Sequence, residues 1–151
     1  MTVSAGSSAL VPTGERVMLP VVRGQTLAGD TLALADLGGQ VVVLNAWGSW
    51  CAPCAEELPL LSSLAKRHED VRFVGLVVRD NPAEALTMRN ELGLASPSIV
   101  DQNGTILQSL PGVPPRAIPS TLVLDRQGAI AATFVGKITA GELQTVLAEP
   151  G

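Results

Sequence analysis

A buried strand that leads into a helix, with both cysteines of the chain at the junction, most restricts the possible fold. The apolar run 41–44 lacks the alternation of a half-exposed strand, which is typical of a central strand covered on both faces. Cys51 and Cys54 follow it, and Pro53 between them suits the first turn of a helix, where its missing N–H is not needed. This pattern predicts an α/β fold whose site lies at the carboxyl edge of the sheet.

The spacing of the two cysteines favours redox chemistry. Thiols at this separation can close into a disulfide across one helical turn, and the helix N-terminus lowers the pKa of the first thiol. We expect Cys51 to be exposed and to attack, and Cys54 to point inward and resolve the intermediate. Trp50 is predicted to form an apolar surface that shields the thiolate and packs against a partner chain.

Other uses of a Cys-x-x-Cys pair fit less well. Structural zinc needs about four ligands, and beyond the cysteines the sequence offers only His68. Covalent haem needs a histidine where Ala55 stands, and a purely structural disulfide closing so short a loop removes little unfolded-state entropy. A copper chaperone or other non-catalytic binding module stays an alternative, although no His or Met ligand is adjacent to the pair. We expect no metal and no cofactor besides the redox-active disulfide.

Composition indicates one domain. The 151 residues are 46% hydrophobic, enough for one core. The net charge of -4, without a Lys or Arg cluster, argues against a nucleic-acid partner or an anionic membrane surface. We predict a flexible segment at 1–15, rich in Ser, Ala and Gly, and a single soluble, monomeric domain at 16–149.

The N-terminus has neither the basic region nor the apolar region of a signal peptide. No apolar run approaches the roughly 20 residues that span a bilayer. Two origins stay open at this point: a cytoplasmic protein, or a chain from which an export signal or membrane anchor has been removed.

Strands and helices alternate through the middle of the sequence, and hairpins are predicted near both ends. Asn81 is a suitable N-cap and Gly93 a suitable stop for one of the helices. The predicted strands are 16–22, 30–33, 40–46, 72–78, 98–100, 120–125 and 129–135, and the predicted helices are 51–67, 82–92 and 139–147.

Two segments carry a specific family resemblance. The run VLNAWGSWCAPCAEELP at 43–59 resembles the active-site segment of the TlpA/ResA-like branch of extracytoplasmic thioredoxin-fold thiol-disulfide oxidoreductases. The run AIPSTLVLDRQG at 117–128 resembles that family's cis-proline loop, and 81–110 its central insertion. The loop RDNP at 79–82 resembles one of actinobacterial members of the branch. The resemblance implies a thioredoxin fold: a central mixed sheet flanked by helices, with an N-terminal hairpin and a central strand-helix insertion.

The resemblance also implies roles for individual residues. Asn45 stands where thioredoxin has a buried aspartate and cannot act as a base. The family places a glutamate at Glu57, where a half-buried carboxyl with a raised pKa could exchange a proton with Cys54. Spacing alone leaves open that Glu57 is a solvated helix charge.

The cis-proline loop carries the remaining predicted site residues. The sequence alone favours a trans bond before Pro119, whereas the resemblance implies a cis bond. In that conformation the backbone of Ile118 would be offered to an extended substrate strand.

The same resemblance implies that the chain reduces disulfides of extracytoplasmic proteins. It would, for example, keep the thiols of apocytochrome c reduced in cytochrome c maturation. A membrane thiol carrier would supply electrons, and the full-length protein would carry a membrane anchor. The alternative is an oxidase or isomerase of exported proteins, because the sequence does not fix the direction of electron flow.

Overall fold

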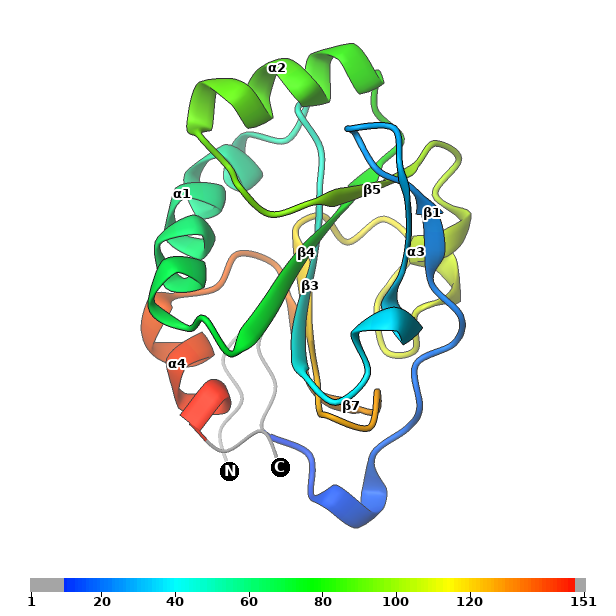
Figure 1. Cartoon of the computed structure of the whole chain (residues 1–151), viewed down its shortest axis with the longest axis vertical. Coiled ribbons are helices and arrows are strands. Elements are labelled where there is room, and N and C mark those ends of the chain that lie inside the picture. The colour runs from blue at the N-terminus through cyan, green and yellow to red at the C-terminus, as the bar shows by residue number, and fades with distance from the viewer. Residues whose placement is uncertain (1–9, 149–151) are drawn as a thin grey trace.

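The computed structural model of the chain describes residues 10–148. Its centre is a five-stranded mixed sheet in the order β5-β4-β3-β6-β7 (Figure 1). β3 and β4 are parallel, as are β4 and β5, whereas β6 is antiparallel to both of its neighbours. The strands are β3 (Val41–Trp47), β4 (Val71–Val78), β5 (Ser98–Asp101), β6 (Ser120–Leu124) and β7 (Ile130–Val135).

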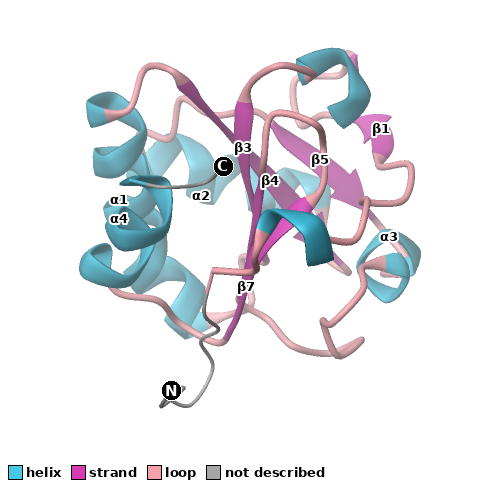
Figure 2. Ribbon diagram, turned by 90° about the horizontal axis from the view of Figure 1, so that it is seen from below, coloured by secondary structure: helices cyan, strands magenta, loops and turns pink. Residues whose placement is uncertain are grey.

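Helices cover both faces of this sheet. In Figure 2, α1 (Ala52–Arg67) and α4 (Ala140–Ala148) lie together on one face, and α3 (Thr105–Ser109) lies on the other with β1. The two short 3-10 helices are Thr13–Glu15 and Leu34–Leu37. The predicted arrangement of a mixed sheet between helices is therefore present.

β3 is the strand on which both halves of the core are built. All seven of its residues are buried, as its unbroken apolar run predicts. Successive side chains point to opposite faces, so Val42 and Leu44 join the core beneath α3, while Val43 packs with α1 and α4. The strand is thereby fixed at the middle of the sheet, and the residues after it emerge at the carboxyl edge.

α2 (Pro82–Leu92) has the predicted bounds. The side chain of Asn81 accepts hydrogen bonds from the backbone N–H groups of Ala83 and Glu84 at 2.9 and 3.4 Å. Gly93 ends the helix at a φ of 64°, a conformation that glycine adopts without steric cost. Local capping residues are enough to define this helix.

The N-terminal hairpin forms, but the prediction of its first strand was wrong. The paired strands are β1 (Arg23–Gln25) and β2 (Thr31–Ala33), and the segment 16–22 makes only one bridge, Met18 to Ala129. Gly24 lies within β1, where this strand packs closely on β5. A Cβ at Gly24 would come within 2.9 Å of the Ile99 side chain.

The segment 1–15, predicted to be flexible, is described by the structure only in part. Residues 1–9 lie outside the described part of the chain, whereas Leu10 packs against the core cluster beneath α1 and α4. The backbone N–H of Val11 donates to the carbonyl of Ala131 at 2.8 Å. Next to this segment, the Arg16 guanidinium pairs with Asp125 at 3.1 Å, and both side chains are buried. Leu10 and Val11 thus contact the domain, and the flexibility of the segment stays a prediction.

Candidate active site

The two cysteines lie at the start of α1, just beyond the carboxyl end of β3. They form a disulfide, with 5.3 Å between their Cα atoms. Cys51 is the N-cap of α1, and its Sγ accepts a hydrogen bond from the backbone N–H of Cys54 at 3.3 Å. Pro53 lies in the first turn, as predicted. A thiolate on Cys51 would therefore be stabilised by a backbone donor and by the positive end of the helix dipole.

Cys51 is buried in this disulfide state, contrary to our expectation of an exposed thiol. It is 5% exposed and Cys54 is fully buried. Both pack in an apolar cluster with Trp47 and Leu58, against which Ile118 also lies. The burial has a tertiary cause, because residues from β3, β4, α2 and the 118–119 loop surround the helix start.

Trp50 provides the exposed apolar surface beside the dithiol. Its side chain is 53% exposed, while its indole N–H donates to the carbonyl of Val78 at 3.1 Å. The ring is therefore anchored to the end of β4 and remains accessible. The predicted contact of Trp50 with a partner chain stays a prediction.

Asp80 holds the segment that precedes the dithiol, a role that the sequence analysis missed. One carboxylate oxygen accepts from the backbone N–H of Ser49 at 2.6 Å, and the other accepts from the Ser49 hydroxyl at 2.7 Å. The Asp80 carboxylate also accepts a hydrogen bond from the backbone N–H of Asn81 at 2.8 Å. The parallel pairing of β3 with β4, which sets Trp47 opposite Val77, brings the two strand ends together.

Replacing Asp80 with alanine should lower the free energy of unfolding by about 1–3 kcal/mol, because it removes a buried carboxylate that accepts three hydrogen bonds from Ser49 and Asn81. Urea denaturation of the oxidised protein measures this loss. Asp36→Ala, which removes an exposed carboxylate, is the control and should change stability by less than about 0.5 kcal/mol. Equal effects of the two substitutions would contradict the role of Asp80.

Glu57 is buried and is not a solvated helix charge. It is 1% exposed, and its two carboxyl oxygens accept from the Asn45 side-chain amide and from the backbone N–H of Ile138, each at 2.8 Å. Burial raises the pKa of Glu57, and the two hydrogen bonds and Lys137 only partly oppose this shift. Its neighbour Glu56 is exposed and pairs with Lys137, which lowers the pKa of Glu56.

The raised pKa of Glu57 has a consequence for stability. Between the unfolded-state pKa and the higher folded-state pKa, the folded protein binds the proton more strongly, so this group makes stability fall as pH rises through that window. We expect Glu57→Gln to remove this slope. Urea denaturation of both oxidised proteins across acid to neutral pH measures it, and parallel stability curves would contradict the prediction.

Asn45 connects β3 to this carboxyl. Its amide nitrogen donates to Glu57 and, at 3.0 Å, to the hydroxyl of Thr121 on β6. Asn45 is thus a donor that orients the Glu57 carboxyl, in keeping with the predicted supporting position.

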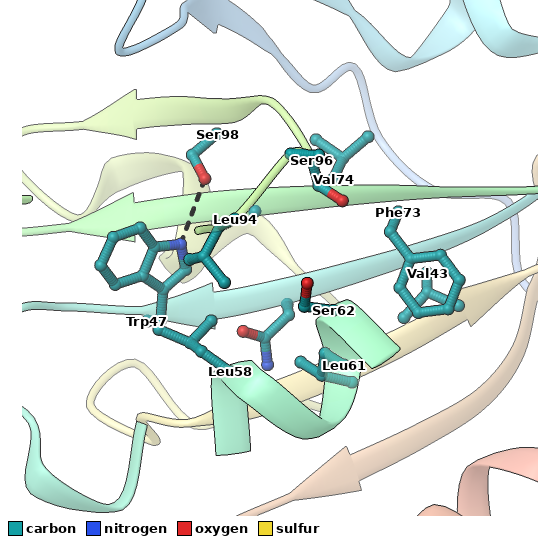
Figure 3. A pocket seen from close by; sticks show the side chains of 13 residues that line it. Val43, Trp47, Leu58, Leu61, Ser62, Phe73, Val74, Leu94, Ser96 and Ser98 are labelled. Atoms are coloured by element: carbon teal, nitrogen blue, oxygen red, sulfur yellow. Dashed lines mark hydrogen bonds between the residues drawn. The ribbon is translucent and has the colours of Figure 1, made fainter. Parts of the chain in front are cut away.

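A small cavity lies beside Asn45, between α1 and the sheet (Figure 3). Its volume is about 40 Å³, and Asn45 is among the residues that line it. Asn45 Oδ1 is buried and makes no hydrogen bond within the described residues. Trp47 closes one side and donates to Ser98 Oγ at 3.2 Å, as the dashed line shows. Water fits a space of roughly 10–15 Å³, so the cavity beside Asn45 is large enough to hold a water molecule.

The loop that contains Ile118 and Pro119, directly before β6, also lies beside the dithiol. The Ile118–Pro119 peptide bond is cis, which confirms the expectation drawn from the resemblance. The carbonyl of Pro119 accepts from the backbone N–H of Gly136 at 2.8 Å, and the Ser120 hydroxyl donates to the carbonyl of Ala117 at 2.7 Å. Both bonds hold the loop in place while Ile118 packs against the dithiol cluster.

Two further properties concern the described residues alone. Within residues 10–148, no helix is long and apolar enough to cross a membrane. In the same part of the chain, His, Cys, Asp and Glu side chains do not gather in any group of three that could hold a metal ion.

A five-stranded sheet, a disulfide at the N-terminus of α1 and a cis-proline loop beside it define a thioredoxin-like thiol-disulfide oxidoreductase. The chain belongs to the redoxin family, whose model matches residues 12–147.

Relatives in sequence carry names of the same class. The chain is 41% identical over 105 residues to a thiol:disulfide interchange protein, DsbE-2, of Pasteurella multocida, covering 69% of this chain and 53% of that protein. The chain thus spans about half the length of that relative. It is 29% identical over 123 residues to the thiol-disulfide oxidoreductase ResA of Bacillus anthracis, covering 80% of this chain and 69% of ResA.

Solved structures agree with this assignment. A DsbF homologue from Corynebacterium diphtheriae is 37% identical, has a TM-score of 0.88, and the match covers 93% of this chain and 90% of the homologue. A secreted thiol-disulfide isomerase from Corynebacterium glutamicum is 34% identical with a TM-score of 0.82, covering 91% and 87%. The predicted thioredoxin fold and the ResA-like family are confirmed.

Proposed function

We propose that the chain reduces disulfides of extracytoplasmic proteins. The substrate would be apocytochrome c, whose cysteine thiols the reaction keeps reduced. The observation that carries the proposal is the Cys51–Cys54 disulfide at a helix N-terminus, with the buried carboxyl of Glu57 one helical turn beyond Cys54. This arrangement contains a nucleophile, a resolving thiol and a titratable group in one continuous segment.

In the proposed reaction, the Cys51 thiolate attacks one sulfur of the substrate disulfide. A Cys51–substrate disulfide forms, and the other substrate sulfur leaves as a thiolate that takes up a proton. Cys54 then gives its proton to ionised Glu57 and attacks Cys51 Sγ. The second substrate sulfur leaves Cys51 as a thiolate and takes up the proton that Glu57 received, directly or through water. The substrate thereby gains two electrons and two protons, and the protein dithiol becomes a disulfide.

The remaining predicted residues would bind the substrate polypeptide. Trp50 offers an exposed apolar surface, and Ile118 would pair its backbone with an extended substrate strand next to Pro119. Pro53 and Asn45 would keep the helix start and the Glu57 carboxyl in position. No cofactor besides the disulfide takes part in this scheme.

The place of action and the electron donor belong to the same proposal. A similar solved protein is described as secreted, which supports a location outside the cytoplasm. There a membrane thiol carrier would reduce the Cys51–Cys54 disulfide after each turnover, and an anchor in the full-length protein would keep the domain near that carrier.

A second candidate is an oxidase or isomerase of exported proteins, because the Corynebacterium glutamicum structure is described as an isomerase. The reduction potential separates the two. Equilibration with defined thiol-disulfide buffers should give a value near that of thioredoxin, about -270 mV, for a reductant. A value nearer that of DsbA, about -120 mV, would replace the proposal with the oxidase. A dithiol that reduces no disulfide but binds metal tightly would indicate the non-catalytic module.

A further inference from the structure

A groove next to the dithiol has no part in the reaction described so far. It has a volume of about 570 Å³ and runs from Trp50 along one side of α2. We call it the α2 groove, and its lining includes Ser49, Trp50, Glu84, Thr87, Met88 and Glu91. Figure 1 shows α2 at the end of the sheet where β3 leads into α1, and Ser49 and Trp50, which directly precede Cys51 in the chain, line the groove.

The helical repeat explains the composition of this groove. Residues at spacings of three, four and seven share one face of a helix. Glu84, Met88 and Glu91 therefore line up along α2 and face the same space as Trp50. Met88 also packs against the dithiol cluster, so it is fixed at the base of the groove.

The groove carries a net negative charge. Glu84 and Glu91 are exposed, and neither forms an ion pair with any residue of the described chain. Arg89, the arginine within α2, points its guanidinium to the carbonyl of Ala95 at 3.5 Å, beyond the helix end. Two carboxylates beside an accessible indole face make a site that attracts a cation.

The wall of the groove is held in place before any partner binds. The Trp50 indole N–H donates a hydrogen bond to the carbonyl of Val78, and Ser49 donates two hydrogen bonds to Asp80. Because these bonds already order the wall, binding does not have to fix it and loses less conformational entropy.

We propose that the α2 groove binds a lysine or arginine side chain of the substrate polypeptide, close in sequence to the cysteine that Cys51 attacks. This inference rests on the proposed function, whose substrate class it narrows. Trp50, which lines the groove, is the sequence neighbour of Cys51, and the groove follows α2 over the two helical turns, about 10 Å, between Glu84 and Glu91. An extended chain covers that length in about three residues, so we expect the basic residue within about three positions of the reacting cysteine.

Single-turnover reduction of paired peptides tests the proposal. Each peptide contains one internal disulfide, and the pair differs only in having lysine or glutamine within three positions of the attacked cysteine. Pre-reduced protein is mixed with excess peptide, and the second-order rate is divided by the rate with uncharged hydroxyethyl disulfide. We expect the lysine peptide to react about tenfold faster at low salt, as exposed ion pairs and one cation–π contact allow, and the preference to shrink at high salt.

The double substitution Glu84→Gln with Glu91→Gln should reduce this preference to about twofold or less. The matched control is Glu69→Gln with Asp70→Asn, which removes two exposed carboxylates beyond the other end of α1 and should keep the full preference. Equal rates of both peptides with the wild-type protein, or a preference that survives the double substitution, would overturn the inference.

Two other results separate the possible failures. If pre-reduced protein reduces neither the peptides nor hydroxyethyl disulfide, the proposed function itself is wrong. If sedimentation shows a dimer that the α2 substitutions dissociate, the groove binds a second copy of the chain and not a substrate lysine.

Discussion

The Cys54→Ser protein, reduced and mixed with a disulfide substrate, is expected to accumulate a covalent adduct at Cys51. The first attack needs only the Cys51 thiolate, which the helix N-terminus and the Cys54 backbone N–H favour. Without the Cys54 thiol, only an external thiol can release the substrate. Because intramolecular attack carries a very large effective concentration, turnover should fall by roughly 10³-fold or more.

Intact-mass measurement followed by peptide mapping checks this prediction. The control is Cys51→Ser, in which the remaining thiol at Cys54 is completely buried in the oxidised structure and should form adducts only slowly. Adducts that form equally fast in both variants would reverse or remove the assigned order of attack. The absence of an adduct with any disulfide substrate would contradict the whole scheme.

Glu57→Gln should slow the resolution of the mixed disulfide by about a hundredfold at neutral pH, the size expected for loss of a general acid–base group. Glutamine keeps the size of the side chain but cannot accept the Cys54 proton. Its amide can also accept only one of the two hydrogen bonds that Asn45 and Ile138 donate to the carboxylate.

The pH profile of the resolution step distinguishes proton transfer from a structural effect. In the wild-type protein the rate should rise as Glu57 ionises, at a pKa that burial places above the usual glutamate value. The variant should lose this rise. Glu56→Gln is the matched control, since Glu56 is an exposed neighbour paired with Lys137 and should leave the profile intact. An unchanged profile in Glu57→Gln would remove the proposed role of this residue.

Local sequence patterns were sufficient for the elements around the site. The apolar run of β3 predicted a fully covered strand because its pattern has no polar alternation, and α2 was placed correctly because Asn81 and Gly93 mark its ends. The cysteine spacing likewise determined that the pair can form a disulfide across one helical turn. Each of these predictions rests on a pattern of residues that lie a few positions apart in the sequence.

Tertiary structure decided the environment of those residues. Asp80 reaches Ser49 from 31 positions away, and Glu57 meets the Ile138 backbone across 81 positions, through strand pairing that periodicity does not specify. The same packing buries Cys51, which local position alone predicts to be exposed. The sequence by itself therefore determined which groups can react, whereas contacts between distant segments decided their burial, and with it the pKa of Glu57, because desolvation depends on everything that surrounds a charge.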